Sequence, residues 1–151
     1  MDTDFLLVDG HSMIFAWPQL RALHQRDQEA GRDRLIRQLT DYQDGAGIKV
    51  VLVFDGAGRR TEETTVPGGI QVFYASASMT ADDLIERLVA SYSERARLLV
   101  ATDDRQEQQT VISLGGDFIT ATEMWGRLED ARRLLDQQVK ATQRRPARKG
   151  R

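Results

Sequence analysis

The sequence contains no cysteine. This absence excludes disulfide bonds, thiol nucleophiles and zinc sites built from thiolates, and it is compatible with a cytoplasmic location. Long apolar runs are also missing, because no segment approaches the roughly 18 residues that cross a bilayer. The N-terminal stretch MDTDFLLVDG carries acids and no basic residue, which is not the pattern of a signal peptide. We therefore expect a cytoplasmic protein that does not associate with membranes.

Acidic residues are missing from the C-terminal end, where residues 140–151 hold six basic groups. The whole chain carries a net charge of −2, so the other 139 residues carry −8. A length of 151 residues, with 40% apolar and 29% charged content, fits one soluble globular domain. We expect this domain over residues 1–143 and a basic, flexible tail over 144–151. The tail is either a solvated end or a contact for an anionic polymer.

Short apolar runs rich in β-branched residues alternate with helical patterns along the chain. The predicted strands are 5–9, 48–55, 69–75, 97–102 and 117–121, and the predicted helices are about 18–29, 31–45, 81–95, 104–114 and 121–143. Residues 56–68 are predicted to form an exposed loop. Alternating strands and helices indicate an α/β fold with a parallel sheet covered on both faces.

Acidic residues follow three of the predicted strands, at the edge where parallel sheets bind their ligands. Asp9 ends LLVDG, Asp55 ends LVFDG, and Asp103 and Asp104 end LLVATDD. Asp82 opens the helix that follows the third strand. Single acids have structural explanations, because Asp55 can be a turn residue and an acid in a first helical turn complements the helix dipole. Asp83, three residues after Thr80, is expected to form a capping box.

Several carboxylates at one edge of a sheet repel one another unless a cation lies between them. Mg²⁺ and Mn²⁺ prefer oxygen ligands, and proteins usually hold Mg²⁺ through one or two carboxylates together with substrate phosphates. The pattern therefore predicts a Mg²⁺ or Mn²⁺ site suited to the hydrolysis of phosphodiester bonds.

Four segments, LLVDGHSMIFAWPQL, VVLVFDG, TADDLIE and VATDDRQEQ, resemble the signature segments of the YacP-like NYN domains in the PIN-like nuclease superfamily. They occur in the family's order, and the resemblance covers about residues 3–140. It implies a three-layer α/β/α sandwich with a mainly parallel five-stranded sheet, and a divalent-metal ribonuclease site. The implied catalytic residues are Asp9, Asp82 and Asp104, and the implied metal ligands are these three together with Asp55 and Asp103.

The sequence departs from the family pattern after the first Asp-Gly, where His11 and Ser12 replace the usual Tyr-Asn. Ser12 can hydrogen-bond a carboxylate or a metal-bound water as asparagine would. His11 is either a general base or a surface residue. We expect Ser12, Glu86 and Thr102 to support the metal ligands, with Glu86 on the same helix face as Asp82.

The resemblance favours a metal-dependent endoribonuclease that leaves a 5′-phosphate and a 3′-hydroxyl, with an RNA substrate that a ribosome can present. The alternative is a non-catalytic RNA- or ribosome-binding module with the same fold. A receiver domain is excluded because the last strand, DFITATEM, lacks the required lysine. Asp9-Gly10-His11 lacks the Asp-x-Asp of haloacid-dehalogenase phosphatases, and no phosphate-binding loop with the Walker spacing is present.

RNA contacts are expected outside the acidic cleft, because an acidic surface repels the phosphate backbone. The candidates are Arg59 and Arg60 in the predicted loop, and Arg144, Arg145, Arg148 and Lys149 in the basic tail. Trp17 either stacks on a base or packs in the core beside Pro18.

Overall fold

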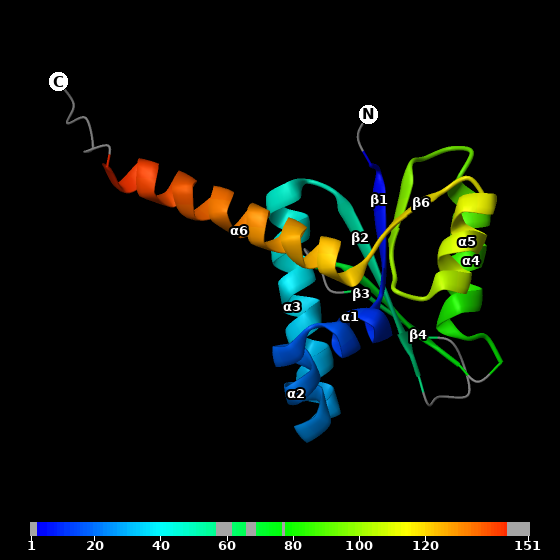
Figure 1. Cartoon of the computed structure of the whole chain (residues 1–151). Helices are drawn as coiled ribbons and strands as arrows, with labels where there is room; N and C mark the ends of the chain where they lie inside the picture. Colours follow the sequence, from blue (N-terminus) through cyan, green and yellow to red (C-terminus); the bar gives the residue numbers. More distant parts are fainter. Residues whose placement is uncertain (1–2, 57–61, 66–68, 77, 145–151) are drawn as a thin grey trace.

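A six-stranded sheet forms the centre of the molecule, within the residues that the structure describes: 3–56, 62–65, 69–76 and 78–144 (Figure 1). The computed structural model contains strands β1 (Phe5–Asp9), β2 (Lys49–Asp55), β3 (Glu62–Thr65), β4 (Gln71–Ala75), β5 (Leu98–Ala101) and β6 (Asp117–Ile119). The helices are α1 (Gly10–Ala16), α2 (Pro18–Arg26), α3 (Gln28–Ala46), α4 (Ala81–Tyr92), α5 (Arg105–Ser113) and α6 (Ala121–Arg144).

The strand order is β3-β4-β2-β1-β5-β6, and the pairs are parallel except for β3 against β4. The five predicted strands and the mainly parallel sheet are therefore confirmed. The prediction of a continuous loop over 56–68 is wrong in part, because Glu62–Thr65 pairs with β4. An edge strand forms backbone hydrogen bonds on one side only, so the polar sequence EETT can form one without an apolar pattern.

The helices cover both faces of the sheet and produce three layers (Figure 1). Apolar residues of α1, α2, α3 and α6 pack on one face against alternate strand residues such as Leu6 and Leu52. Apolar residues of α4 and α5 pack on the other face against the intervening residues, such as Leu7 and Val53. Because both faces are buried, the central strands are apolar at nearly every position.

The order in which the chain adds strands to the sheet reverses between β1 and β5. From β1 it runs outward through β2 to β4, and it then crosses to β5 on the other side of β1. Helices that follow two neighbouring strands on opposite sides of such a point diverge, and a crevice opens at the carboxyl ends of these strands. The pocket at this edge is lined by Asp9 at the end of β1 and by Asp103 and Asp104, which follow β5.

Helix α1 follows β1 without an intervening loop, and no separate helix was predicted there. Its first residue, Gly10, lies against Phe54 of β2: a Cβ atom at Gly10 would be 2.6 Å from the Phe54 ring. Glycine therefore allows the chain to turn from β1 into α1 directly after Asp9, and the Asp-Gly pair has a packing explanation.

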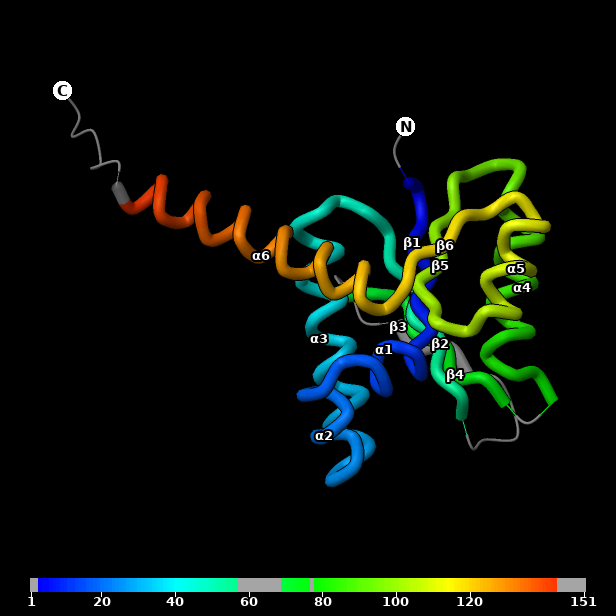
Figure 2. The backbone as a smooth tube through the Cα atoms, in the orientation of Figure 1, coloured from blue at the N-terminus to red at the C-terminus, as the bar shows by residue number. Residues whose placement is uncertain are grey.

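Trp17 separates α1 from α2 and is 5% exposed. Its indole Nε1 donates a hydrogen bond to the Ala121 carbonyl oxygen at 2.9 Å, and its ring meets Trp125 edge-on with a centroid distance of 5.1 Å. Trp17 thus fixes the start of α6 on the domain, and of the two predicted roles the structure supports core packing. Beyond this anchor, α6 extends away from the rest of the domain (Figure 2).

No helix in the described part of the chain combines the length and the apolar character that crossing a membrane requires.

Candidate metal centre

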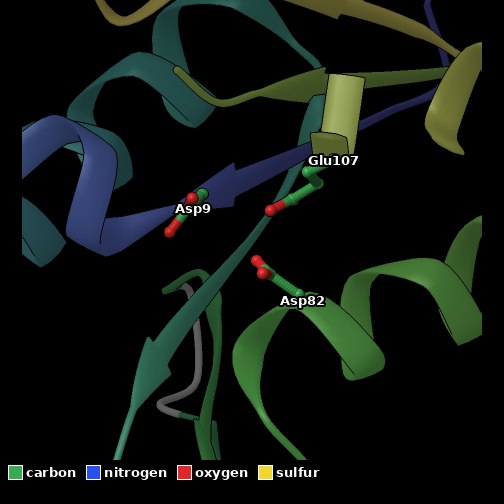
Figure 3. Close-up of side chains that lie close together, drawn as sticks. All are labelled: Asp9, Asp82 and Glu107. Atoms are coloured by element: carbon green, nitrogen blue, oxygen red, sulfur yellow. The ribbon is translucent and has the colours of Figure 1, made fainter. Parts of the chain in front are cut away.

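Three carboxyl groups converge at the crevice beside the end of β1. Asp9 is the last residue of β1, Asp82 lies in the first turn of α4, and Glu107 lies in the first turn of α5. One carboxylate oxygen of each lies within 4.8 Å of the others. Figure 3 shows Asp82 and Glu107 reaching toward each other from two helices, with Asp9 beside them on the end of a strand.

Asp9 is buried and is held by two hydroxyl groups. The Ser12 Oγ donates to the Asp9 Oδ2 at 2.9 Å, and the Thr102 Oγ1 donates to the same oxygen at 3.0 Å. The hydroxyls in turn accept the backbone N–H groups of Asp103, at 3.0 Å, and Asp104, at 3.2 Å. With Oδ2 saturated in this way, the other oxygen of Asp9 is free to bind a cation.

Glu107 is 2% exposed, and neither of its side-chain oxygens accepts a hydrogen bond from an N–H or hydroxyl group of the described residues. Burial, followed by a hydrogen bond shared with the carboxyl group of Asp82, raises the pKa of Glu107 to about 10. Burial also raises the pKa of Asp9, although the hydrogen bonds from Ser12 and Thr102 oppose this shift. A buried carboxylate without partners is costly, and a cation at the cluster would offset this cost.

The donor set fits a small hard cation. All three groups offer carboxylate oxygens, which suit Mg²⁺ and Mn²⁺ rather than metals that prefer thiolates or imidazoles. The buried oxygens of Glu107, which have no N–H or hydroxyl partner among the described residues, are the observation that most directly fits a cation at this cluster. No lysine or arginine is among the described residues that line the adjacent pocket.

The other predicted metal ligands each cap the start of a helix. The Oδ1 of Asp55 accepts the Ala81 N–H at the start of α4 at 3.0 Å, and the Oδ1 of Asp103 accepts the Ala121 N–H at the start of α6 at 2.8 Å. The Oδ1 of Asp104 accepts two N–H groups at the start of α5. These positive helix ends partly balance the acidic charge at this edge of the sheet.

These capping residues border the same pocket, which has a volume of about 490 Å³. Its lining comprises Asp9, His11, Ser12, Phe15, Ala16, Asp55, Asp82, Asp103 and Asp104. The structure thus brings all five predicted ligands to one pocket. The group of three carboxylates that lie close enough to share a cation, however, contains Glu107 and not Asp104. Glu86 lies one turn farther along α4 and does not line the pocket.

Of the predicted RNA contacts, Arg144 alone belongs to the residues that the structure describes, where it is the last residue of α6. The others, namely Arg59, Arg60, Arg145, Arg148 and Lys149, lie outside the described residues.

A family model described as the YacP-like NYN domain matches residues 6–151 of this sequence. The chain belongs to the YacP-like NYN domain family. YacP of Bacillus subtilis (strain 168) is 35% identical over 147 residues, which cover 95% of this chain and 86% of that protein. The resemblance that the four sequence segments indicated is therefore confirmed, and with it membership of a PIN-like nuclease class.

Two crystal structures of Rae1 (YacP) from Bacillus subtilis have the same fold. One, of a point mutant, is similar with a TM-score of 0.81 and 32% identity, covering 95% of this chain and 85% of that one. The other has a TM-score of 0.76 and 31% identity, covering 92% of this chain and 81% of that one. The YacP-like α/β/α architecture predicted for this chain is thus confirmed.

Within this YacP-like NYN domain, Glu107 is the site residue that sequence reasoning missed. Glu107 follows the N-cap residue Asp104 by three residues, which is the position of the glutamate in a capping box. A glutamate at that position is normally exposed. The pattern that could have revealed it is the spacing of Glu107, Val111 and Leu114, which puts the glutamate on the apolar face of α5. Val111 is fully buried on that face.

We predict that the metal-free protein loses stability as the pH rises. Folded Glu107 keeps its proton up to a pKa of about 10, whereas a glutamate with the ordinary value of 4.5 releases it far earlier. Between these values the folded state binds more protons than the unfolded state, so the free energy of unfolding falls with pH, by at most about 1.4 kcal/mol per unit for one proton.

Denaturant titrations between about pH 5 and pH 9, in the presence of a chelator, measure this slope. The Glu107→Gln variant resembles the protonated glutamate and should show a smaller decline. Equal slopes for wild type and Glu107→Gln would show that Glu107 does not carry the buried proton.

Proposed function

We propose that this chain is a cytoplasmic, divalent-metal-dependent endoribonuclease that hydrolyses RNA phosphodiester bonds with Mg²⁺ or Mn²⁺. The observation that carries the proposal is the convergence of Asp9, Asp82 and Glu107, with oxygens of the buried glutamate left without N–H or hydroxyl partners among the described residues. Membership of the YacP-like NYN family, within a nuclease class, supports it.

In this proposal Asp9, Asp82 and Glu107 hold the cation. A bound Mg²⁺ or Mn²⁺ supplies an activated water and stabilises the charge on the leaving oxygen. Ser12 and Thr102 keep Asp9 in one orientation, because both donate to the same carboxylate oxygen. The capping contacts of Asp55 and Asp103 fix α4 and α6 relative to the sheet, so the residues around the cleft are preorganised.

His11 is not required as a general base in this scheme, because a metal-activated water needs no imidazole. The ring lies at the exposed side of the pocket, on the first turn of α1. We therefore expect His11→Ala to retain more activity than a substitution of Asp9.

Single-turnover cleavage of end-labelled RNA tests the proposal. With Mn²⁺ the wild-type protein should produce fragments with 5′-phosphate and 3′-hydroxyl ends, and a chelator should stop the reaction. RNA binding without any metal-dependent cleavage would instead identify a non-catalytic RNA- or ribosome-binding module.

The substrate must reach an acidic pocket, and we propose that basic residues outside it bind the RNA backbone. We predict that deleting residues 144–151 weakens RNA or ribosome binding and flattens its salt dependence, because fewer counterions are released. Cleavage at saturating substrate should persist, since no metal ligand is lost. Binding measured across a salt series gives the slope.

The control for this truncation is the double variant Arg59→Ala/Arg60→Ala. If the truncated protein keeps the full salt slope and the double variant loses it, residues 56–68 contact the RNA and the tail does not.

A further inference from the structure

An exposed aromatic ring borders the acidic pocket. Phe15 is 50% exposed, although phenylalanine is normally buried. It lines the pocket together with Asp9 and Asp82. Among the described residues, the other large exposed apolar side chains, such as Phe118 and Tyr92, do not line this pocket.

A second ring supports Phe15. His11 lies one turn earlier on α1, and the two ring centroids are 4.3 Å apart with an angle of 43° between the planes. Residues four apart lie on the same face of a helix, and at this separation the two rings are in contact. We refer to them as the Phe15–His11 pair.

The position of this pair relative to the metal centre is fixed by local structure. Helix α1 starts directly after Asp9, and Gly10 is packed against Phe54. Met13 and Ile14, which are buried on other sides of α1, attach the helix to the core. The pair is therefore presented on a rigid element beside the carboxylates, and no rearrangement is needed to expose it.

We propose that the Phe15–His11 pair stacks against one unpaired base of the RNA substrate. This inference rests on the proposed function and adds to it the residues that contact a base beside the carboxylates. A nucleic acid offers flat base faces next to its phosphates, which matches aromatic rings next to a cation site. The pocket volume of about 490 Å³ is in the range of sites for small organic groups.

Stacking of this kind selects against a duplex. In an A-form helix the base faces are covered by neighbouring pairs, whereas bases in single strands, loops and bulges can turn outward onto an aromatic side chain. Stacking on a ring face accepts every base, so this contact selects unpaired character and not sequence.

The test combines substitutions of Phe15 with single abasic positions in the RNA. Short single-stranded oligonucleotides, each lacking one base, are bound to the full-length protein with Ca²⁺, and a gel verifies that the RNA remains intact. For wild type, removing the base at one particular position should weaken binding by roughly 5- to 100-fold. For Phe15→Ala, removing the base at the same position should lower the binding affinity by less than about twofold, because the ring on which the base stacks is already missing.

Three further variants separate stacking from other contacts. Phe15→Trp should keep the dependence on the abasic position, and Phe15→Leu should lose it, since leucine is apolar but offers no ring. Phe118→Ala removes an exposed phenylalanine outside the pocket and should behave as wild type. A duplex of the same sequence should bind more weakly than the single strand, and substitution of Phe15 should change its binding little.

The inference is overturned if wild type and Phe15→Ala show the same profile across all abasic positions. It is equally overturned if Phe15→Leu matches wild type, because Phe15 would then make a general apolar contact. The proposed function fails separately. A protein that shows the expected abasic profile and does not cleave RNA with Mn²⁺ retains the stacking pair without being a nuclease.

Discussion

Asp82→Asn is expected to abolish RNA cleavage, whereas the neighbouring Asp83→Asn is expected to leave most of the activity. Asp82 points toward Asp9 and Glu107 from the first turn of α4 (Figure 3). Loss of a residue that supports a metal ligand typically lowers metal affinity or activity by roughly 10- to 100-fold. Loss of the ligand itself should lower activity by more than that. The fold should be preserved, because Asp82 contributes nothing to the apolar core.

Asp83 is a matched control on the same helix turn. It forms a capping box: its N–H donates to the Thr80 Oγ1 at 3.2 Å, and its carboxylate accepts the Thr80 N–H at 3.3 Å. Asp83→Asn removes a negative charge near a helix N-terminus, which should cost about 0.3–1 kcal/mol of stability. Single-turnover rates of both variants give the comparison. Equal losses of activity would mean that the wrong face of α4 has been assigned to the metal.

Glu107→Gln is expected to remove most of the stabilisation that Mn²⁺ gives the folded protein. A ligand that binds only the folded state at 100 times its dissociation constant stabilises it by about 2.7 kcal/mol. For a domain of this size, that corresponds to a rise of roughly 5–10 °C in Tm. The glutamine keeps the shape of the buried side chain but removes its charge, so the metal-free variant should fold as wild type does.

Thermal melts with and without Mn²⁺ measure this effect, and Glu86→Gln is the control because Glu86 does not line the pocket. Asp104→Asn distinguishes the two possible ligand sets. If Asp104→Asn loses the Mn²⁺ response and Glu107→Gln keeps it, the third ligand is the aspartate that the family resemblance implied.

The sequence was sufficient to predict five of the six described strands and most of the carboxylates at their carboxyl ends. Asp9 and Asp55 follow apolar strands, and parallel strands end at the same edge, so their proximity could be inferred without coordinates. Thr80 and Asp83 have the capping-box spacing, and the structure contains that box. Each of these features follows from a local sequence pattern, together with the rule that parallel strands end at the same edge of a sheet.

Features that depend on helix phase or on contacts distant in sequence could not be predicted in the same way. Asp104 caps α5 through the N–H groups of Gln106 and Glu107, and the Glu107 side chain is buried on the same side of α5 as Val111. Similarly, Ser12 and Thr102 are 90 residues apart and meet at Asp9 only because β5 lies beside β1. The strand order must be known before such a contact can be proposed.

The short helix α1 and the edge strand β3 were missed for different reasons. Gly10, at the start of α1, is a poor helix former, and its place there depends on the packing of Phe54 from another strand. Strand β3 has the polar sequence EETT, and it is specified by backbone pairing with β4 and not by its own side-chain pattern.

The central claim is that Asp9, Asp82 and Glu107 form one cation site. The most direct measurement is a crystal structure of the wild-type protein soaked with Mn²⁺, with an anomalous difference map recorded at the manganese edge. We predict a single dominant peak at about 2.0–2.3 Å from one carboxylate oxygen of each of these residues. A dominant peak among Asp55, Asp103 and Asp104, or no peak at this edge of the sheet at millimolar Mn²⁺, would contradict the account.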